Sequence, residues 1–174
     1  RVTSGSEPDG EPSAFPPALR VPKATFVTVK RDGDLMGCIG SLEPRYPLVR
    51  DVAKNAYGAI FYDPRCPRLD PSDVPDLEIH ISILGEPEPM EFRDEADLVS
   101  QLRPGVDGLI LEEDFARGTF LPSVWESLPE PRQFLANLKM KAGLPPSYWS
   151  RTLRVRRYTT ESFSAEDVAD AHGA

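Results

Sequence analysis

The chain has 174 residues, of which 40% are hydrophobic and 28% are charged, and its formal net charge at pH 7 is −8. This composition suits one globular domain with a hydrophobic core, or one domain with a small appended lobe. The excess of negative charge argues against general binding to nucleic acid or to anionic lipid, because both carry phosphate.

The cysteine and histidine content is low, and Cys38, Cys66, His80 and His172 are the full set. Two cysteines are too few for the disulfide framework of a small secreted domain, so we expect a reducing compartment. A structural zinc site needs about four ligands, and these residues are too scattered to form a motif. No apolar run approaches the roughly 20 residues of a membrane-spanning helix, and no secretory leader is recognisable. We therefore expect a cytoplasmic protein that uses no membrane, metal or cofactor.

The first 22 residues are rich in proline, serine, glycine and glutamate, and proline interrupts helical hydrogen bonding. We therefore expect residues 1–22 to be a flexible lead-in. The sequence of residues 25–30 is typical of a strand. Residues 31–34 then provide a turn in which Gly33 can adopt positive φ, and residues 35–39 return as the second strand of a hairpin.

A helix and a strand are predicted next. Pro47 suits the first position of a helix, and apolar residues then recur at helical spacing up to Ile60. The helix should end before Pro64, because the residue before a proline avoids the α region. Residues 77–84 alternate apolar and polar side chains, which is typical of a half-buried strand.

The second half of the chain predicts shorter elements. They are a helix capped by Asp94, strands at residues 108–111 and 119–121, a helix from Pro131 that ends at Gly143, and a strand at residues 151–158. Ser123 and Glu126 fit a capping box. Hairpins with scattered helices favour an α+β fold with a mainly antiparallel sheet. We expect the folded domain to span residues 23–163, followed by a mobile tail at residues 164–174.

Cys38 is the sharpest single feature, because it lies between Gly37 and Gly40 near the end of a predicted strand. Missing side chains at these glycines allow a ligand or a second stretch of backbone to approach closely. A thiolate there could attack an electrophilic carbon if a base or positive potential lowered its pKa. A small buried residue in a glycine-containing strand explains the same pattern.

His80 lies on the polar face of the strand predicted at residues 77–84, two residues from Glu78. If this face also carries Cys38, His80 becomes a candidate general base for the thiol, and Glu78 a candidate to orient the imidazole. A half-exposed histidine on a solvated strand is the simpler explanation.

Arginines provide the candidates for anion binding. Arg65 and Arg117 could each bind a carboxylate or phosphate group, and a structural salt bridge explains either residue equally well. Cys66, next to Arg65, is either a redox partner for Cys38 or an ordinary loop residue. The one basic cluster fits a strand with a solvated face, with nucleic-acid contact as the minor alternative; it consists of Arg151, Arg154, Arg156 and Arg157.

Several catalytic signatures are missing from the sequence. It contains no glycine-rich phosphate loop, no paired histidine ligands on a helix and no Gly-x-Ser-x-Gly. These gaps argue against nucleotide-dependent enzymes, zinc peptidases and serine hydrolases.

A series of collinear motifs resembles the AMMECR-one domain family. The motifs are residues 25–30, 35–42, 47–48, 55–56, 63–65, 77–84, 105–109, 117–124, 134–135 and 141–145, and together they cover residues 23–163. The resemblance implies an α+β fold of two unequal lobes with a cleft between them, and a site at the glycine–cysteine motif. The family has no settled reaction. Its bacterial and archaeal members are associated with a Memo-type protein and a radical-SAM protein, in the AmmeMemoRadiSam system.

The sequence departs from the family pattern at four places. The family usually has arginine directly before Gly-Cys, where this chain has Met36. An aromatic residue usually follows Asp-Pro-Arg, where this chain has Cys66, and the middle of the long strand usually carries an acidic residue, where this chain has His80. The usual leading helix is not recognisable in residues 1–22. The chemistry of the site is therefore expected to be altered.

Two functional hypotheses follow. In the first, the chain is an enzyme or enzyme subunit that acts on a small molecule, with Cys38 as nucleophile, His80 as base and Arg65 or Arg117 holding an anionic group. Gly37 and Gly40 would then border the bound substrate. In the second, the domain is a non-catalytic module that binds a partner protein of the Memo or radical-SAM type.

Overall fold

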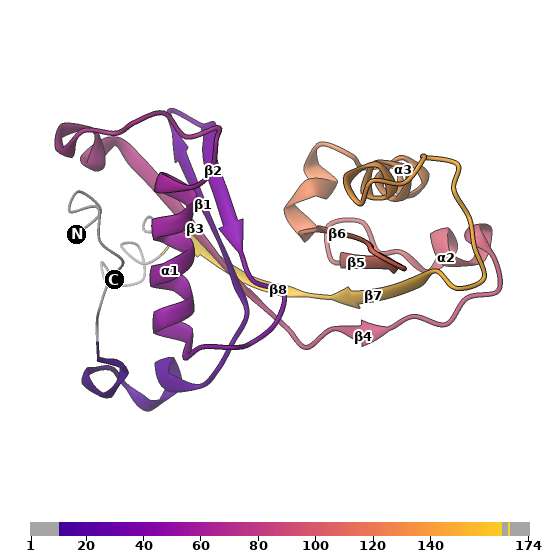
Figure 1. Cartoon of the computed structure of the whole chain (residues 1–174), viewed down its shortest axis with the longest axis horizontal. Coiled ribbons are helices and arrows are strands. Elements are labelled where there is room, and N and C mark those ends of the chain that lie inside the picture. Colours follow the sequence, from indigo (N-terminus) through magenta and orange to yellow (C-terminus); the bar gives the residue numbers. More distant parts are fainter. Residues whose placement is uncertain (1–10, 165–166, 168–174) are drawn as a thin grey trace. The chain divides into compact units, whose positions relative to one another are not determined.

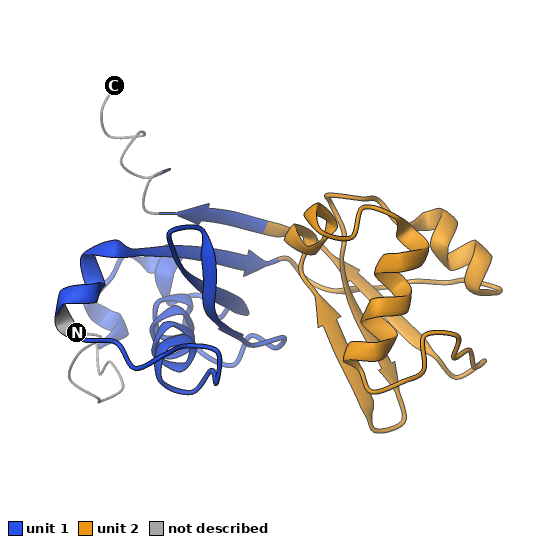
Figure 2. Cartoon of the chain, turned by 90° about the horizontal axis from the view of Figure 1, so that it is seen from above, with its two compact units in different colours: residues 1–84, 161–174 blue, residues 85–160 orange. Residues whose placement is uncertain are grey.

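The structure is a computed structural model that describes residues 11–164 and Asp167. The described chain contains three α-helices and two four-stranded, mainly antiparallel sheets, which confirms the predicted α+β class. It divides into two compact units, one formed by residues 1–84 with 161–174 and the other by residues 85–160 (Figure 2). Among the residues described, no helix has the length and hydrophobicity needed to cross a bilayer.

The first unit is a sheet with one long helix on one of its faces (Figure 1). The strand order is β2-β1-β3-β8, and β1 pairs antiparallel with both of its neighbours. The bounds are β1 Thr25–Arg31, β2 Asp34–Gly40, α1 Leu48–Phe61, β3 Leu77–Leu84 and β8 Thr160–Ser164. The turn between β1 and β2 has positive φ at Gly33, as its sequence predicts, and also at Asp32.

Strand alternation explains which face of this sheet carries the core. Val27 and Val29 of β1 are fully buried, and Val29 packs with Ala59 and Ile60 of α1. Because side chains alternate along a strand, the residues between the valines belong to the opposite face. That face bears polar side chains, and it is the one of interest for function.

Asp51 of α1 links the helix to the sheet. Its carboxylate is 2% exposed and accepts hydrogen bonds from the backbone N–H and the hydroxyl of Thr25 at 2.9 and 2.7 Å. The Asn55 amide donates to it at 3.0 Å, and the Ser41 hydroxyl donates at 2.9 Å. Neutral donors thus satisfy the buried carboxylate and tie α1 to β1 and to the end of β2.

The second unit is a separate sheet with its own core. The strand order is β4-β7-β5-β6. The bounds are β4 Glu88–Pro89, α2 Glu95–Gln101, β5 Gly108–Glu113, β6 Ala116–Phe120, α3 Pro131–Lys141 and β7 Arg154–Tyr158. Leu109, Leu111 and Val155 of the sheet pack in one cluster with Phe134 and Leu138 of α3.

Lys139 and Glu113 are among the buried charged residues of the second unit. Lys139 is fully buried and forms an ion pair with Glu95 at 3.1 Å. Glu113, 4% exposed, accepts hydrogen bonds from the hydroxyls of Thr152 and Tyr148 at 2.7 and 3.0 Å. The hydrogen bond from the Thr152 hydroxyl makes the largest contribution to the lowered pKa of Glu113. Glu113 therefore fixes the segment before β7 to the end of β5.

Most predicted elements are confirmed, and the corrections concern their ends. Pro47 precedes α1 as its N-cap residue instead of opening it. The predicted capping box is wrong, because a 3₁₀ helix begins at Pro122 and its N-cap residue, Leu121, makes no side-chain cap bond. The sequence analysis also missed β4 and β8.

The proposed lead-in and tail fall partly outside the described residues. Within residues 11–22, two 3₁₀ helices span Pro12–Ala14 and Pro17–Arg20. The Val21 carbonyl accepts a hydrogen bond from the N–H of Leu48 at 3.0 Å, which ties this segment to the start of α1. Residues 1–10, 165, 166 and 168–174 lie outside the description.

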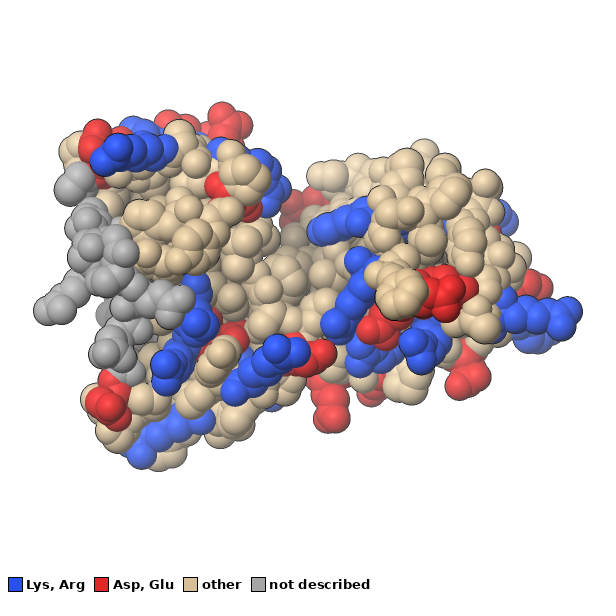
Figure 3. All heavy atoms as spheres, viewed as in Figure 1, with Lys and Arg blue, Asp and Glu red and all other residues tan. Residues whose placement is uncertain are grey.

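Charges of both signs are distributed over the surface. Figure 3 shows Lys and Arg side chains next to Asp and Glu side chains on the face in view. Although the chain has 28 acidic and 20 basic residues, a charged ligand would therefore meet side chains of both signs on this face.

Candidate functional site

The register of the first sheet places Cys38, Thr28 and His80 in one row across three strands. Thr28 in the central strand β1 lies opposite Cys38 of β2 on one side and opposite His80 of β3 on the other. Directly opposed residues of antiparallel strands project from the same face. All three residues are half-buried, and their face is the one turned away from the valines of the core.

Thr28 is in contact with the thiol of Cys38. The backbone N–H of Cys38 donates to Asp63 Oδ2 at 2.9 Å, so it points away from β1. Thr28 and Cys38 are therefore a non-hydrogen-bonded pair, in which the side chains come closest, with Cα atoms about 4.5 Å apart. The Thr28 hydroxyl donates to Cys38 Sγ at 3.3 Å.

His80 lies one strand further along the same row. The backbone N–H and C=O of Thr28 do not point toward β2, so they point toward β3. Thr28 and His80 therefore form the hydrogen-bonded type of pair, with Cα atoms about 5.5 Å apart. In the described part of the chain, His80 makes no hydrogen bond to Cys38, because Thr28 stands between them. His80 Nε2 lies 3.8 Å from Glu78 Oε2, so Glu78 is placed where it can orient the imidazole.

Asp63 and Arg65 hold the backbone of Cys38. The Asp63 side chain is 4% exposed and accepts hydrogen bonds from Arg65 Nε at 2.9 Å and Nη2 at 2.6 Å. The pKa of Asp63 is well below its usual range, because of the Arg65 hydrogen bond first and the Cys38 N–H as a further cause, while burial opposes them. Cys38 is thus fixed by a carboxylate that stays ionised.

Cys66 follows Arg65 in this loop, and both cysteines are free thiols. Burial raises the pKa of the Cys66 thiol, and the negative charge of Asp63 raises it further. A thiol with a raised pKa is a poor nucleophile at neutral pH, because the thiolate is the reactive species.

The missing side chains of Gly37 and Gly40 make room for other parts of the first unit. A Cβ atom on Gly37 would lie 2.1 Å from the carbonyl oxygen of Ala59 in α1. A Cβ atom on Gly40 would lie 2.3 Å from the ring of Phe26. Of the two uses expected for these glycines, close approach of another backbone describes Gly37, whereas packing of an aromatic ring at Gly40 was not expected.

Met36 occupies an irregular point of β2. The register between β1 and β2 shifts between Val29 and Lys30, so that Val29 pairs with Gly37 and Lys30 with Leu35. Met36 is the extra residue, and its side chain packs against the apolar cluster of Val29, Ala59 and Ile60. Met36 therefore contributes an apolar contact to the core of the first unit.

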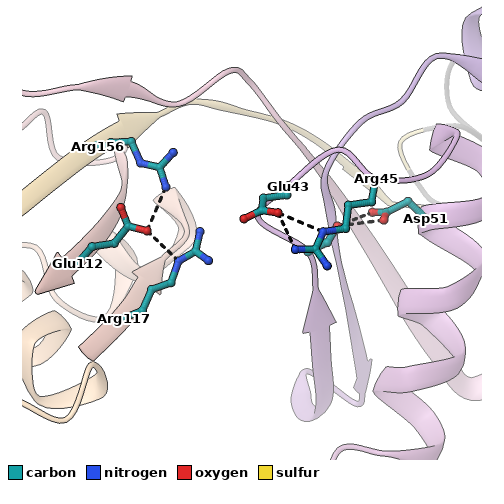
Figure 4. Close-up of polar contacts among 7 residues, drawn as sticks. Glu43, Arg45, Asp51, Glu112, Arg117 and Arg156 are labelled. Carbon is teal, nitrogen blue, oxygen red and sulfur yellow. Dashed lines mark hydrogen bonds and ion pairs between the residues drawn. The ribbon is translucent and has the colours of Figure 1, made fainter. Parts of the chain in front are cut away.

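Arg117 belongs to the second unit, where it takes part in an ion-pair cluster. Arg117 Nε of β6 and Arg156 Nη2 of β7 lie 3.1 and 3.2 Å from the same oxygen of Glu112 in β5 (Figure 4). Glu43 and Arg45 form a separate exposed pair in the first unit, at 2.6 Å. Arg65 and Arg117 thus both have carboxylate partners of their own.

Sequence reasoning missed two residues of the site in the first unit. Thr28 could have been found from alternation, because it lies at the centre of the first predicted strand and opposite the returning one. Asp63 is part of a recognised motif, but a local pattern does not reveal its bond to Cys38, 25 residues away. Among the described residues there is no cluster of three or more His, Cys, Asp or Glu side chains suited to a metal, and His172 lies outside them.

Comparison with known proteins gives one consistent result. The AMMECR1 family model matches residues 2–163. A protein from Methanothermobacter thermautotrophicus is 39% identical over 158 residues, which cover 87% of this chain and 80% of that protein. A protein from Thermococcus gammatolerans is 37% identical over 166 residues, covering 89% and 78% of the two chains. The crystal structure of the uncharacterized protein PH0010 from Pyrococcus horikoshii matches with a TM-score of 0.86 and 33% identity, over 95% of this chain and 84% of that one. The chain therefore belongs to the AMMECR1 family.

Proposed function

We propose that this AMMECR1 domain acts on a small molecule with an electrophilic carbonyl carbon, and that Cys38 is the nucleophile. The observation that carries the proposal is the hydrogen bond from the Thr28 hydroxyl to Cys38 Sγ, within a row that continues to His80. A thiol that only fills space in a core does not need a hydroxyl donor beside it.

The row supplies a path for the proton that the thiol must lose. In the observed bond the Thr28 hydroxyl donates to Cys38 Sγ. A threonine hydroxyl both donates and accepts, so in the relay it rotates, takes the proton from the thiol and passes its own to His80. The pair of residues at positions 28 and 80 lies at side-chain contact distance, roughly 5 Å between Cβ atoms. His80 is the general base and Thr28 the relay, which replaces the direct Cys–His contact expected from the sequence.

The chemical step balances without a cofactor. Cys38 Sγ forms a C–S bond to the carbonyl carbon while the π electrons of the carbonyl move to its oxygen. The proton taken up by His80 then passes to that oxygen, so the product is a neutral thiohemiacetal-type adduct. Glu78, 3.8 Å from His80 Nε2, stabilises the imidazolium that exists between the two proton transfers.

Arg65 is the residue that we propose for an anionic group of the substrate. Its side chain is 52% exposed, and Asp63 uses its Nε and Nη2 atoms. A guanidinium group has five N–H donors, so Arg65 has donors beyond the two that Asp63 uses. The proposal does not rely on Gly37 or Gly40, since the protein itself fills the space beside them.

The test compares the two cysteines of one molecule by alkylation with iodoacetamide, with mass spectrometry of each site. Cys38 should react faster than Cys66, whose raised pKa makes it an internal control. Thr28→Val and His80→Gln should slow alkylation of Cys38 about tenfold and leave Cys66 unchanged. Cys38→Ser should remove the fast phase.

A different result would favour the non-catalytic alternative. If Cys38 reacts no faster than Cys66, or if neither Thr28→Val nor His80→Gln changes its rate, the nucleophile proposal is wrong. The domain would then be a binding module, and co-purification with a Memo-type or radical-SAM partner would be the next measurement.

A further inference from the structure

A pocket of about 580 Å³ lies beside β7 in the second unit. It is lined by three residues of the basic cluster, Arg151, Arg154 and Arg156, and we call it the arginine pocket. Sites for small molecules usually measure roughly 300 to 1,000 Å³. The arginine pocket is therefore large enough for a ligand, and it belongs to a unit that does not contain Cys38.

The pocket arises from alternation along β7. Val155 is 2% exposed and belongs to the core, so the flanking Arg154 and Arg156 project from the other face of the sheet. Arg154 pairs in register with Glu112 of β5, which also lines the pocket. Arg157 shares the face of Val155, does not line the pocket and lies 3.9 Å from Glu88.

The charges around the pocket do not cancel. Glu91 and Glu112 are the acidic residues of its lining, against three arginines, and Arg117 adds a fourth guanidinium at Glu112. One oxygen of Glu112 is shared by two guanidinium groups, those of Arg117 and Arg156. Figure 4 shows Arg117 and Arg156 converging on Glu112 from neighbouring strands.

Guanidinium donors remain available in the pocket. Arg156 Nε is buried and has no hydrogen-bond acceptor in the described structure. Within residues 11–164, Arg151 and Arg154 have no carboxylate within ion-pair distance, although both are exposed at the rim. A buried N–H without an acceptor is unfavourable, so an anion that reached Arg156 would satisfy it.

We propose that the arginine pocket binds the carboxylate or phosphate group of a small organic molecule. Guanidinium groups bind both anions through pairs of N–H donors in a fixed plane. Phe92 lines the pocket and packs on Trp149, with ring centroids 5.6 Å apart, so it offers an apolar wall for the rest of the ligand. A polymer of phosphates is disfavoured, because Glu91 and the net charge of −8 would repel its other groups.

The experiment titrates the whole chain with phenyl phosphate, benzoate, inorganic phosphate and the neutral benzyl alcohol, using calorimetry and Trp149 fluorescence. At least one organic anion should bind with a dissociation constant below about 1 mM, and benzyl alcohol should not bind. The order of phenyl phosphate and benzoate identifies the preferred head group, and inorganic phosphate measures the contribution of that group alone.

Substitutions then locate the site. Arg156→Gln should weaken binding about tenfold, and so should Arg154→Gln, whose exposed side chain can be replaced without loss of the fold. Arg157→Gln removes the same charge from the opposite face and should leave affinity unchanged. Absence of saturable binding for both organic anions, or equal weakening by all three substitutions, would overturn the proposal. Because these arginines belong to the second unit and Cys38 belongs to the first, a normal alkylation profile would not rescue it.

Discussion

The two sheets have the same design but different chemistry on their open faces. Each sheet buries one face under helices and leaves polar side chains on the other. On the first sheet the polar row is Cys38, Thr28 and His80, where a hydroxyl bonds to a thiol. On the second sheet Arg117 and Arg156 share one carboxylate. Uncharged groups on the first sheet suit proton transfer and bond formation, whereas guanidinium groups on the second suit recognition of an anion.

The buried carboxylates sharpen this comparison, because each unit has one that neutral donors satisfy. Asp51→Ala leaves donors of Thr25, Asn55 and Ser41 without an acceptor, so the first unit should lose about 3–5 kcal/mol. Glu113→Ala should cost the second unit about 2 kcal/mol, since fewer donors are orphaned.

Urea denaturation can assign each loss to its unit. Both tryptophans of the chain, Trp125 and Trp149, belong to the second unit, so their fluorescence reports on it alone. Asp51→Ala should shift the circular dichroism transition to lower urea and move the fluorescence transition less. Identical shifts of both signals would show that the two units unfold together.

Alanine substitution of a closely packed glycine should also affect the two units differently, with a smaller loss of unfolding free energy. Gly37→Ala places a methyl group against the Ala59 carbonyl of α1, which is fixed backbone, so we expect a loss of about 2–3 kcal/mol. Gly118→Ala in β6 meets Ala142 at 3.0 Å from its Cβ and 3.1 Å from its backbone nitrogen, a less severe overlap that should cost about 1 kcal/mol. Thermal unfolding of the two variants measures the difference, and equal losses would contradict the close approach of α1 to β2.

The pH dependence of stability gives the smallest effect. In the folded state the pKa of Asp63 is lowered by Arg65, so the unfolded chain binds the proton more tightly. The contribution of Asp63 is complete above its ordinary pKa, about 4, and is lost as the pH falls below it. We expect about 1 kcal/mol, because Arg65 is half-exposed.

The variant Asp63→Asn separates the contribution of Asp63 to the pH dependence from that of other carboxylates. The pKa of Glu113 is also lowered, first by Thr152, so the wild type alone would report both units. Free energies of unfolding at pH 6 and pH 3 should differ less for Asp63→Asn than for the wild type. The prediction fails if the two proteins lose stability in parallel.

Local patterns were sufficient for most of the fold. Alternation at residues 25–30 and 77–84 and the spacing of apolar residues before Pro64 predicted β1, β3 and α1. The two-residue strand β4 has no periodicity to detect, and β8 is a short, mostly polar segment at the end of the predicted domain. Both are strands because a neighbouring strand offers hydrogen bonds, which is tertiary information.

Cys38 and His80 were identified from the sequence as candidate site residues, but the geometry that relates them was not predicted. Cys38 and His80 lie on one face, which the sequence had left open. Their separation depends on strand order, and β1 inserts Thr28 between them. The use of Gly37 and Gly40 could not be predicted, because a sequence does not show whether a ligand, α1 or Phe26 fills the space beside a glycine.

The pairing of β8 with β3 has a consequence for how the protein is made. The chain leaves the first sheet at Leu84 and supplies the last strand of that sheet only from Thr160 onward. The residues between them form a core of their own, so the second unit can fold on the ribosome while the first sheet still lacks an edge. The first sheet of the nascent chain therefore keeps β3 unpaired on one side until β8 has been translated.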